Sequence, residues 1–295
     1  MDNALRKLIQ KINYQVLGGF MASSFANING TKIWYELSGS GDVVVQIGGA
    51  VSAHEGYETV TPEIEKHFTV LNYDHRGYGL SDRPKQTYTI QTWCDDLEAL
   101  LAELNIEKAH IHGGSMGSFI AIAFAIKFPK RVGKLLLGAG AVAKCDGMGV
   151  SHFKVWQYLA KSYGVGSIEV ADELVNKAFS REYIDLQGRE KLIELMQDTA
   201  KRNADTDVFI DACQVMIDAD VRADLKNIEA PTLVMVGSED VLTPLDSGPN
   251  GVGARQVAES IKRSELKIFN GSGHGHYAEC ADESVNAILD FLNKN

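Results

Sequence analysis

Residues 109–128 read AHIHGGSMGSFIAIAFAIKF, and this stretch of the chain decides the fold. Residues 109–112 have the character of a short strand, and the run of small and apolar residues from 115 to 128 is helical until Pro129 ends it. Between them lies Gly-Gly-Ser-Met-Gly, a G-x-S-x-G pattern in the strand-to-helix context that holds a serine on a strained turn. We therefore predict that the Ser115 hydroxyl projects above a β-sheet as a nucleophile.

The residues around Ser115 suit this geometry. Gly113 and Gly117 remove side chains where a sharp turn brings the backbones of strand and helix together. A serine at the start of a helix also lies where negative charge is favoured. The alternative is that Ser115 only caps the helix.

Strand and helix patterns alternate along the rest of the chain. Residues 90–104 have helical periodicity, and residues 58–67 also resemble a helix. Such alternation predicts an α/β fold with a mostly parallel central sheet, right-handed crossovers and flanking helices. The predicted strands are residues 31–37, 43–47, 68–73, 109–112, 132–137, 232–236 and 266–269.

A long helical insertion interrupts this alternation. The strand at 232–236 follows the strand at 132–137 after far more chain than the dozen or so residues a crossover needs. We predict a helical cap at residues 146–222, inserted into a core formed by residues 24–145 and 223–295. Its helical patterns are residues 153–163, 168–179, 191–202 and 208–217, and its aromatic residues include two candidate substrate contacts, Phe153 and Trp156.

The N-terminal residues 1–23 form a predicted amphipathic helical extension. Apolar residues recur at helical spacing from Leu5 to Val16 before Gly18-Gly19 breaks the pattern. The helix could dock on its own domain, on a second subunit in a homodimer, or weakly on a membrane surface. Polar residues interrupt any apolar core of a secretory signal here, so we expect the protein to be cytoplasmic.

Composition excludes several classes of partner. The formal net charge of −10 would repel a phosphate backbone, so nucleic acid is not expected. Every apolar run is far shorter than the roughly 18 residues of a membrane span. The four cysteines are scattered without a CxxC pair, which fits neither a disulfide framework nor a zinc site. His110 and His112 share a strand face without an evident third ligand, so we expect no metal.

A nucleophilic serine needs a base, and the base needs an orienting acid. Asp240 comes just after the strand at 232–236, and His274 comes just after the strand at 266–269. The carboxyl ends of parallel strands are where open α/β sheets build their sites. Alternatives are Glu239 or Asp146 as the acid and His276 as the base.

Four segments together resemble the α/β-hydrolase fold superfamily over residues 24–295. They are the GGSMG turn, the DHRGYGLS turn at 74–81, the segment 231–244 around Asp240, and Gly273-His274 followed by Glu279. Within the superfamily, the chain is most similar to the group of enol-lactonases, cofactor-free haloperoxidases and small esterases. The order Ser, Asp, His agrees with this architecture. Asp74 and Arg76 are expected to stabilise their turn, with substrate contact as the alternative.

An oxyanion hole is expected from two backbone N–H groups. One belongs to Met116, which follows the nucleophile, and the other to the loop after the strand at 43–47, where Gly49 is the best candidate. The family usually has a histidine before the glycine of this loop, whereas this chain has Ile47. The replacement of histidine by Ile47 affects the expected shape of the loop. It does not remove the hydrogen-bond donor, because the donor is a backbone N–H group.

We therefore expect a serine hydrolase that cleaves a small-molecule carboxylic ester or lactone through Ser115, His274 and Asp240, with no cofactor. Hydrolysis of a carbon–carbon bond in a diketone or ring-cleavage product needs the same residues and is the first alternative. A ligand-binding receptor on the same fold is an alternative of another class. Haloalkane and epoxide chemistry is disfavoured because those relatives carry an aspartate where this chain has Ser115.

Overall fold

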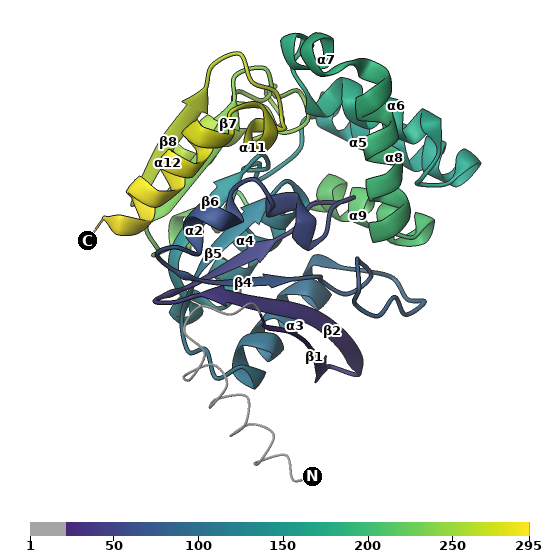
Figure 1. The fold of residues 1–295 in the computed structure, drawn as a ribbon. Coiled ribbons are helices and arrows are strands. Elements are labelled where there is room, and N and C mark those ends of the chain that lie inside the picture. The colour runs from purple at the N-terminus through teal and green to yellow at the C-terminus, as the bar shows by residue number, and fades with distance from the viewer. Residues whose placement is uncertain (1–21, 295) are drawn as a thin grey trace.

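Eight strands form one central sheet in the computed structural model, which describes residues 22–294 (Figure 1). Their order across the sheet is β1-β2-β4-β3-β5-β6-β7-β8. The pairs β1/β2 and β2/β4 are antiparallel and all other neighbours are parallel, so the predicted mostly parallel sheet is confirmed. The strands are β1 Ala22–Ile28, β2 Thr31–Gly39, β3 Val43–Ile47, β4 Thr69–Tyr73, β5 Ala109–Gly114, β6 Val132–Gly138, β7 Thr232–Gly237 and β8 Ser264–Phe269.

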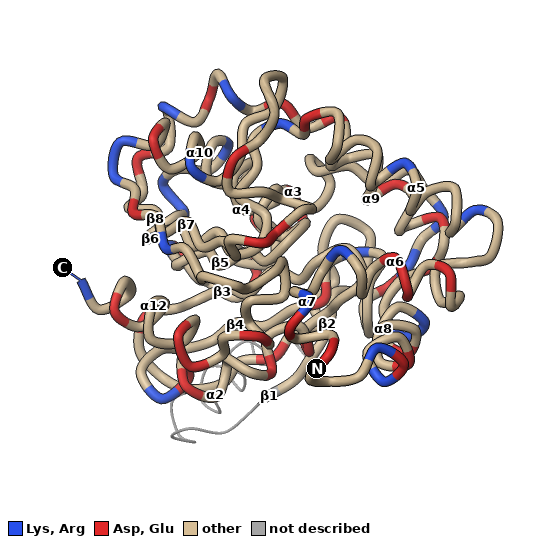
Figure 2. Tube along the Cα trace, turned by 90° about the horizontal axis from the view of Figure 1, so that it is seen from above, with Lys and Arg blue, Asp and Glu red and all other residues tan. Residues whose placement is uncertain are grey.

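Helices cover both faces of the sheet (Figure 2). Because successive side chains of a strand point to opposite faces, Val44 packs in the cluster under α2 and α12, whereas Val45 packs in the cluster with α3 and α4. Parallel strands that are buried on both faces, like this one, are therefore apolar at nearly every position. The helices of the core are α2 Thr61–Ile64, α3 Ile90–Glu103, α4 Met116–Lys127, α10 Ala254–Ser260, α11 His276–Glu279 and α12 Ala281–Asn293, with 3-10 turns η1 His54–Tyr57, η2 Pro129–Arg131 and η3 Leu225–Asn227.

Between β6 and β7 the described chain is helical. Figure 1 shows these helices gathered at one end of the sheet. The four predicted helical patterns are all helices, and a fifth, α7, is a short helix that begins after Ser180 and ends at Gly188, whose φ is 85°. The five are α5 Gly147–Tyr163, α6 Ile168–Ala178, α7 Arg181–Gln187, α8 Arg189–Asn203 and α9 Thr206–Asp218. We call them the cap.

The cap has two kinds of core. Ala171, Val175, Leu192 and Ile193 form a small apolar cluster of their own between α6 and α8. By contrast, α5 and α9 contribute their buried residues to the main core of the sheet. The cap is therefore anchored on the core mainly through α5 and α9, and Val170 and Leu174 of α6 and Ala200 of α8 also belong to the main core.

The structure differs from the sequence prediction at residues 58–67. The single helix predicted at 58–67 is wrong, because η1 ends before this segment and the segment itself contains only the four-residue α2 between turns. Helix α2 starts where Pro62 can occupy its first turn. The amphipathic pattern within residues 1–23 lies outside the described residues. None of the helices between residues 22 and 294 has the length and hydrophobicity of a transmembrane segment.

Candidate active site

Ser115 lies in a strained turn between β5 and α4. Its φ of 54° and ψ of −125° are unusual for a residue with a side chain. The neighbouring glycines are required, because a Cβ on Gly113 would overlap the carbonyl of Gly117, and a Cβ on Gly117 would overlap the carbonyl of Ile47. The Ser115 N–H donates to Gly138 O at 2.9 Å. The turn thus leaves the Ser115 side chain partly exposed above the sheet.

His274 connects Ser115 to Asp240. Its Nε2 lies 2.9 Å from Ser115 Oγ, and its Nδ1 lies 2.9 Å from Asp240 Oδ2. Asp240 and His274 lie in the loops that follow β7 and β8, whose parallel pairing brings their carboxyl ends to the same edge of the sheet, and Ser115 follows β5 of the same sheet. The arrangement provides a hydroxyl, a base within hydrogen-bonding distance of it, and a carboxylate that orients the base.

Asp240 is buried and saturated with hydrogen bonds. Its Oδ1 accepts from the N–H groups of Leu242 and Thr243, each at 2.9 Å, and its Oδ2 accepts from Thr243 Oγ1 at 2.7 Å. Burial alone would raise the pKa of the Asp240 carboxyl, but the charge and hydrogen bond of His274 and the donors of Thr243 hold this pKa below its usual value. Sequence reasoning missed Thr243, although the Asp-x-x-Thr spacing is a common self-bonding turn.

The alternative acids and the alternative base form other contacts. Glu239 is exposed. Asp146 caps α5 by accepting the N–H groups of Met148 and Gly149. His276 is buried, stacks on Phe269 with ring centroids 4.5 Å apart, and bonds Ser284 through Nδ1.

The two residues expected to supply the oxyanion donors lie next to Ser115. Met116 is the first residue of α4, where an N–H has no partner within the helix. Gly49 is also close, since a Cβ built on it would lie 3.1 Å from Ser115 Cβ. The Gly49 N–H, however, donates to Ser52 Oγ at 2.9 Å. Sequence reasoning missed Ser52, a polar residue in the loop that carries the candidate oxyanion donor.

Phe153 and Trp156 are buried where the cap joins the core. Their exposed fractions are 2% and 4%. Their rings pack edge to face at 5.5 Å, and Trp156 also stacks on Phe209 of α9. Trp156 therefore holds α5 against α9 and Phe153 packs on Trp156. The contact of either side chain with a substrate stays a prediction.

A buried polar cluster lies beneath the turn at Ser115. His112 Nε2 bonds Tyr277 Oη at 2.6 Å, and Tyr57 Oη donates to Ile47 O at 2.8 Å. Burial lowers the pKa of His112 to about 3 and that of His110 to about 4. The imidazoles of His110 and His112 are therefore neutral and packed in the interior. Between residues 22 and 294, no group of three or more His, Cys, Asp and Glu side chains is arranged to hold a metal ion.

Asp74 and Arg76 bond within the protein. Asp74 accepts from the N–H and Nδ1 of His54, each at 2.8 Å, and from the N–H of Leu80 at 2.8 Å. The hydrogen bond to Asp74 raises the pKa of His54. Arg76 makes a two-pronged bond to the Asp96 carboxylate at 2.7 and 2.8 Å. These contacts tie the turn to the loop after β3 and to α3.

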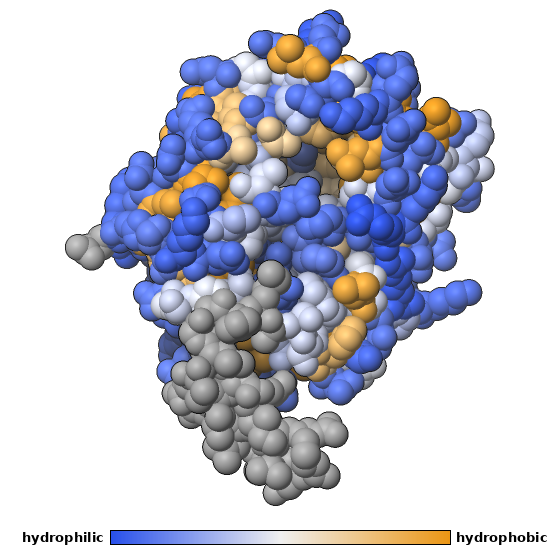
Figure 3. All heavy atoms as spheres, viewed as in Figure 1, coloured by the Kyte–Doolittle hydropathy of each residue, from blue (hydrophilic) through white to orange (hydrophobic). Residues whose placement is uncertain are grey.

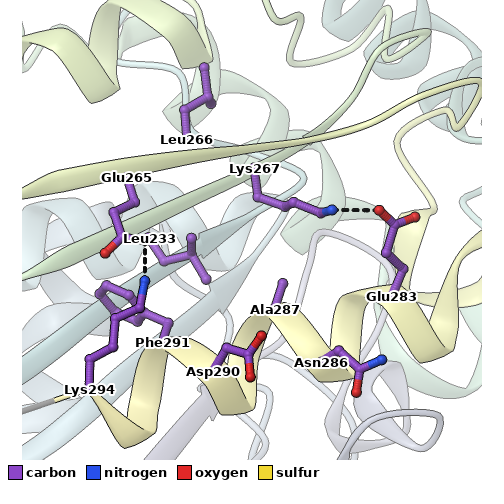
Figure 4. A pocket seen from close by; sticks show the side chains of 10 residues that line it. All are labelled: Leu233, Glu265, Leu266, Lys267, Glu283, Asn286, Ala287, Asp290, Phe291 and Lys294. Atoms are coloured by element: carbon purple, nitrogen blue, oxygen red, sulfur yellow. Dashed lines mark hydrogen bonds and ion pairs between the residues drawn. The ribbon is translucent and has the colours of Figure 1, made fainter.

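A surface cavity of about 280 Å³ lies between β8 and α12, away from this site (Figure 4). It is lined by Leu233 and Glu265, which stand at the amino ends of β7 and β8, whereas Asp240 and His274 follow the carboxyl ends. Its lysines, Lys267 and Lys294, are paired with glutamates. The space-filling view shows a separate hollow where the cap meets the core (Figure 3).

Comparison with known proteins shows what the chain is similar to. The family model described as alpha/beta hydrolase fold matches residues 42–279. A 2-hydroxymuconate semialdehyde hydrolase from Pseudomonas sp. (strain CF600) is 30% identical over 266 residues, covering 86% of this chain and 88% of that protein. A 2-hydroxy-6-oxo-6-phenylhexa-2,4-dienoate hydrolase from Comamonas testosteroni is 28% identical over 289 residues, covering 92% and 95%. The enol-lactonase structure from Burkholderia xenovorans LB400, 24% identical, matches with a TM-score of 0.81 over 92% of this chain and 100% of its own.

Proposed function

The chain belongs to the alpha/beta hydrolase fold family and is a hydrolase, and we propose that it cleaves a carboxylic ester or lactone through an acyl-enzyme on Ser115. The observation that carries the proposal is the unbroken set of hydrogen bonds from Asp240 through His274 to Ser115, with both distances at 2.9 Å. Relatives that are hydrolases favour catalysis by hydrolysis over a receptor that only binds its ligand.

In the first half of the reaction, Ser115 Oγ attacks the carbonyl carbon while its proton passes to His274 Nε2. The negative oxygen that forms accepts hydrogen bonds from the N–H groups of Met116 and Gly49. The buried Asp240 carboxylate stabilises the imidazolium and keeps its Nδ1 proton directed inward. When the tetrahedral intermediate collapses, His274 returns the proton to the leaving oxygen.

In the second half, water attacks the acyl group on Ser115. His274 takes a proton from this water, and the same two N–H groups stabilise the second oxyanion. Collapse releases the carboxylic acid and returns the proton to Ser115 Oγ. The chemistry uses only side chains and backbone groups of this chain.

Carbon–carbon bond hydrolysis is the second candidate, and the two curated relatives favour it. The substrate named for the Comamonas testosteroni protein carries a ketone and no ester, so its hydrolysis must break a carbon–carbon bond. Attack of Ser115 on the ketone would give the same tetrahedral intermediate, and the leaving group would depart as a carbon that takes up the proton. Both candidates therefore use the same three side chains.

A fluorophosphonate probe tests for the activated serine without knowledge of the substrate. We expect mass spectrometry to find labelling confined to Ser115 and lost in His274→Ala. Steady-state assays with p-nitrophenyl esters, lactones and a 2-hydroxy-6-oxo-dienoate then separate the two candidates. Ser115→Ala is expected to lower kcat by roughly 10³-fold or more; turnover within tenfold of the wild type would refute the proposal.

A further inference from the structure

The loop that carries His274 touches a turn of the cap on both sides of the imidazole. The N–H of Gly275 donates to the carbonyl of Ala178 at 2.7 Å. A Cβ built on Gly273 would lie 2.8 Å from the nitrogen of Ser180, and one on Gly275 would lie 2.6 Å from the ring of Phe179. The absence of side chains at 273 and 275 thus lets the turn between α6 and α7 lie directly against the base.

One carboxylate joins the same two segments. Glu279, the last residue of α11, accepts the N–H of Gly273 at 3.1 Å. It also accepts the N–H of Ser180 at 3.3 Å, from a residue 99 positions away in the sequence. Hydrogen bonds to an ionised acceptor are about twice as strong as neutral ones. The residue before His274 and the first turn of α7 are therefore held by a single side chain.

The role of Glu279 is not that of a surface ion pair. Among the described residues no Lys or Arg lies within salt-bridge distance of it, and its partners are backbone N–H groups. Ser180 is 5% exposed, so the link lies inside the contact between cap and core. Tyr183 of α7 is nearby: burial raises its pKa, and the charge of Glu279 adds to this effect.

We propose that Glu279 is a positioning residue that couples the position of the cap to the position of the His274 imidazole. The proposal rests on the proposed function. Asp240 holds one edge of the imidazole, but the backbone at 273–275 sets where its Nε2 meets Ser115 Oγ. Misplacement of a catalytic group by about 1 Å can cost a hundredfold in rate. Proton transfer from Ser115 is therefore efficient only while the turn at 178–180 lies on the loop.

Variants of Glu279 test the core side of this link. Glu279→Gln and Glu279→Ala are expected to lower kcat at least tenfold for p-nitrophenyl acetate and p-nitrophenyl octanoate alike, with KM changed less than threefold. The reason is that the base is displaced whatever the size of the acyl group. The matched control is Glu283→Gln, which removes a carboxylate of α12 that pairs with the half-exposed Lys267.

A pair of variants at Ser180 tests the cap side. The φ of −68° at Ser180 and the extended backbone of Phe179 before it are both compatible with proline. Ser180→Pro deletes the N–H that donates to Glu279 and fills the space beside the carboxylate. Ser180→Ala keeps this N–H and removes only the hydroxyl that caps α7. We expect Ser180→Pro to lower kcat tenfold relative to Ser180→Ala. In a protein that already carries Glu279→Ala, Ser180→Pro should lower kcat little further, because both changes break the same contact.

We measure the rate of fluorophosphonate labelling at Ser115 and divide it by the folded fraction obtained from thermal unfolding. This ratio separates an effect on the position of His274 from an effect on the stability of the protein. The proposal predicts slower labelling of the folded Glu279→Ala protein. It is overturned if labelling and kcat stay within threefold of the wild type while only Tm falls, or if KM rises for the octanoate alone. Activity that persists in Ser115→Ala would instead refute the proposed function, so the two failures are distinguishable.

Discussion

Ser52 competes for a backbone donor of the proposed oxyanion hole. Because the Gly49 N–H donates to Ser52 Oγ, a substrate oxygen must take this donor from the hydroxyl. A neutral hydrogen bond contributes about 0.5–1.5 kcal/mol net, so Ser52→Ala is expected to raise kcat/KM by up to about tenfold. Steady-state assay of the hydrolysed p-nitrophenyl ester is the measurement.

The control for this prediction is Ser151→Ala, which removes an exposed hydroxyl of α5 that bonds its own helix. Its kcat/KM should equal that of the wild type. A fall in kcat/KM for Ser52→Ala would contradict the prediction and would mean that the hydroxyl itself donates to the substrate.

Thr243 supplies a hydroxyl to the buried Asp240 carboxylate and lies 3.1 Å from His274 Nδ1. Thr243→Val keeps the backbone N–H and removes this hydroxyl, which raises the pKa of Asp240 and leaves the carboxylate less firmly held. Hydrogen bonds to charged groups contribute about 1.5–3 kcal/mol, so we expect kcat to fall by about tenfold. Thr243→Ser should restore kcat; equal rates for Val and Ser would refute this role.

At the scale of elements, the turn between β5 and α4 depends on its glycines. A Cβ at Gly117 would overlap the carbonyl of Ile47, so Gly117→Ala must push α4 away from β3. Overpacking of this kind costs roughly 3 kcal/mol or more where neither partner can move. Urea unfolding followed by circular dichroism should show a lower free energy of unfolding for Gly117→Ala than for the wild type.

Gly147, the first residue of α5, is the matched control for this prediction. A Cβ there would meet no atom within 4 Å, so Gly147→Ala should change the free energy of unfolding by less than about 1 kcal/mol. Equal stability of the two variants would show that the turn can open without cost.

Elements with a strong local pattern were predictable, and those that depend on packing were not. The strands at 43–47 and 232–236 are near-continuous apolar runs, interrupted only by Gln46 and Thr232, as burial on both faces favours. The seven residues of α7 are too few to show a helical period. The residues at 58–67 have helical spacing, but only the four residues of α2 among them form a helix. In both places contacts with distant segments decide the structure.

At the scale of the whole molecule, buried imidazoles make stability depend on pH. Burial lowers the pKa of His75 to about 4 and those of His112 and His276 to about 3. As pH falls below about 6.5, the unfolded chain takes up protons that the folded chain excludes. The free energy of unfolding should therefore fall between pH 6.5 and 4, by up to about 1.4 kcal/mol per pH unit for each group.

His75→Phe tests this dependence. The His75 ring packs against the Tyr78 ring with centroids 4.1 Å apart and the two planes tilted by 42°. Its two nitrogens have no hydrogen-bond partner in the described structure, so phenylalanine can replace it. Urea unfolding at pH 7, 6 and 5 should give a shallower decline for the variant than for the wild type. An unchanged slope would show that His75 takes up no proton on unfolding.

The sequence by itself determined the α/β fold, the turn at Ser115 and the strand ends where Asp240 and His274 stand, because strand periodicity and glycine spacing are local properties. Only the tertiary structure decided that Asp240, rather than Glu239 or Asp146, lies against His274. It also revealed Ser52 on Gly49 and Glu279 between His274 and the cap. The direction of a side chain at a strand end follows from packing, and so do contacts between residues about a hundred positions apart in the sequence. No local sequence pattern encodes this packing.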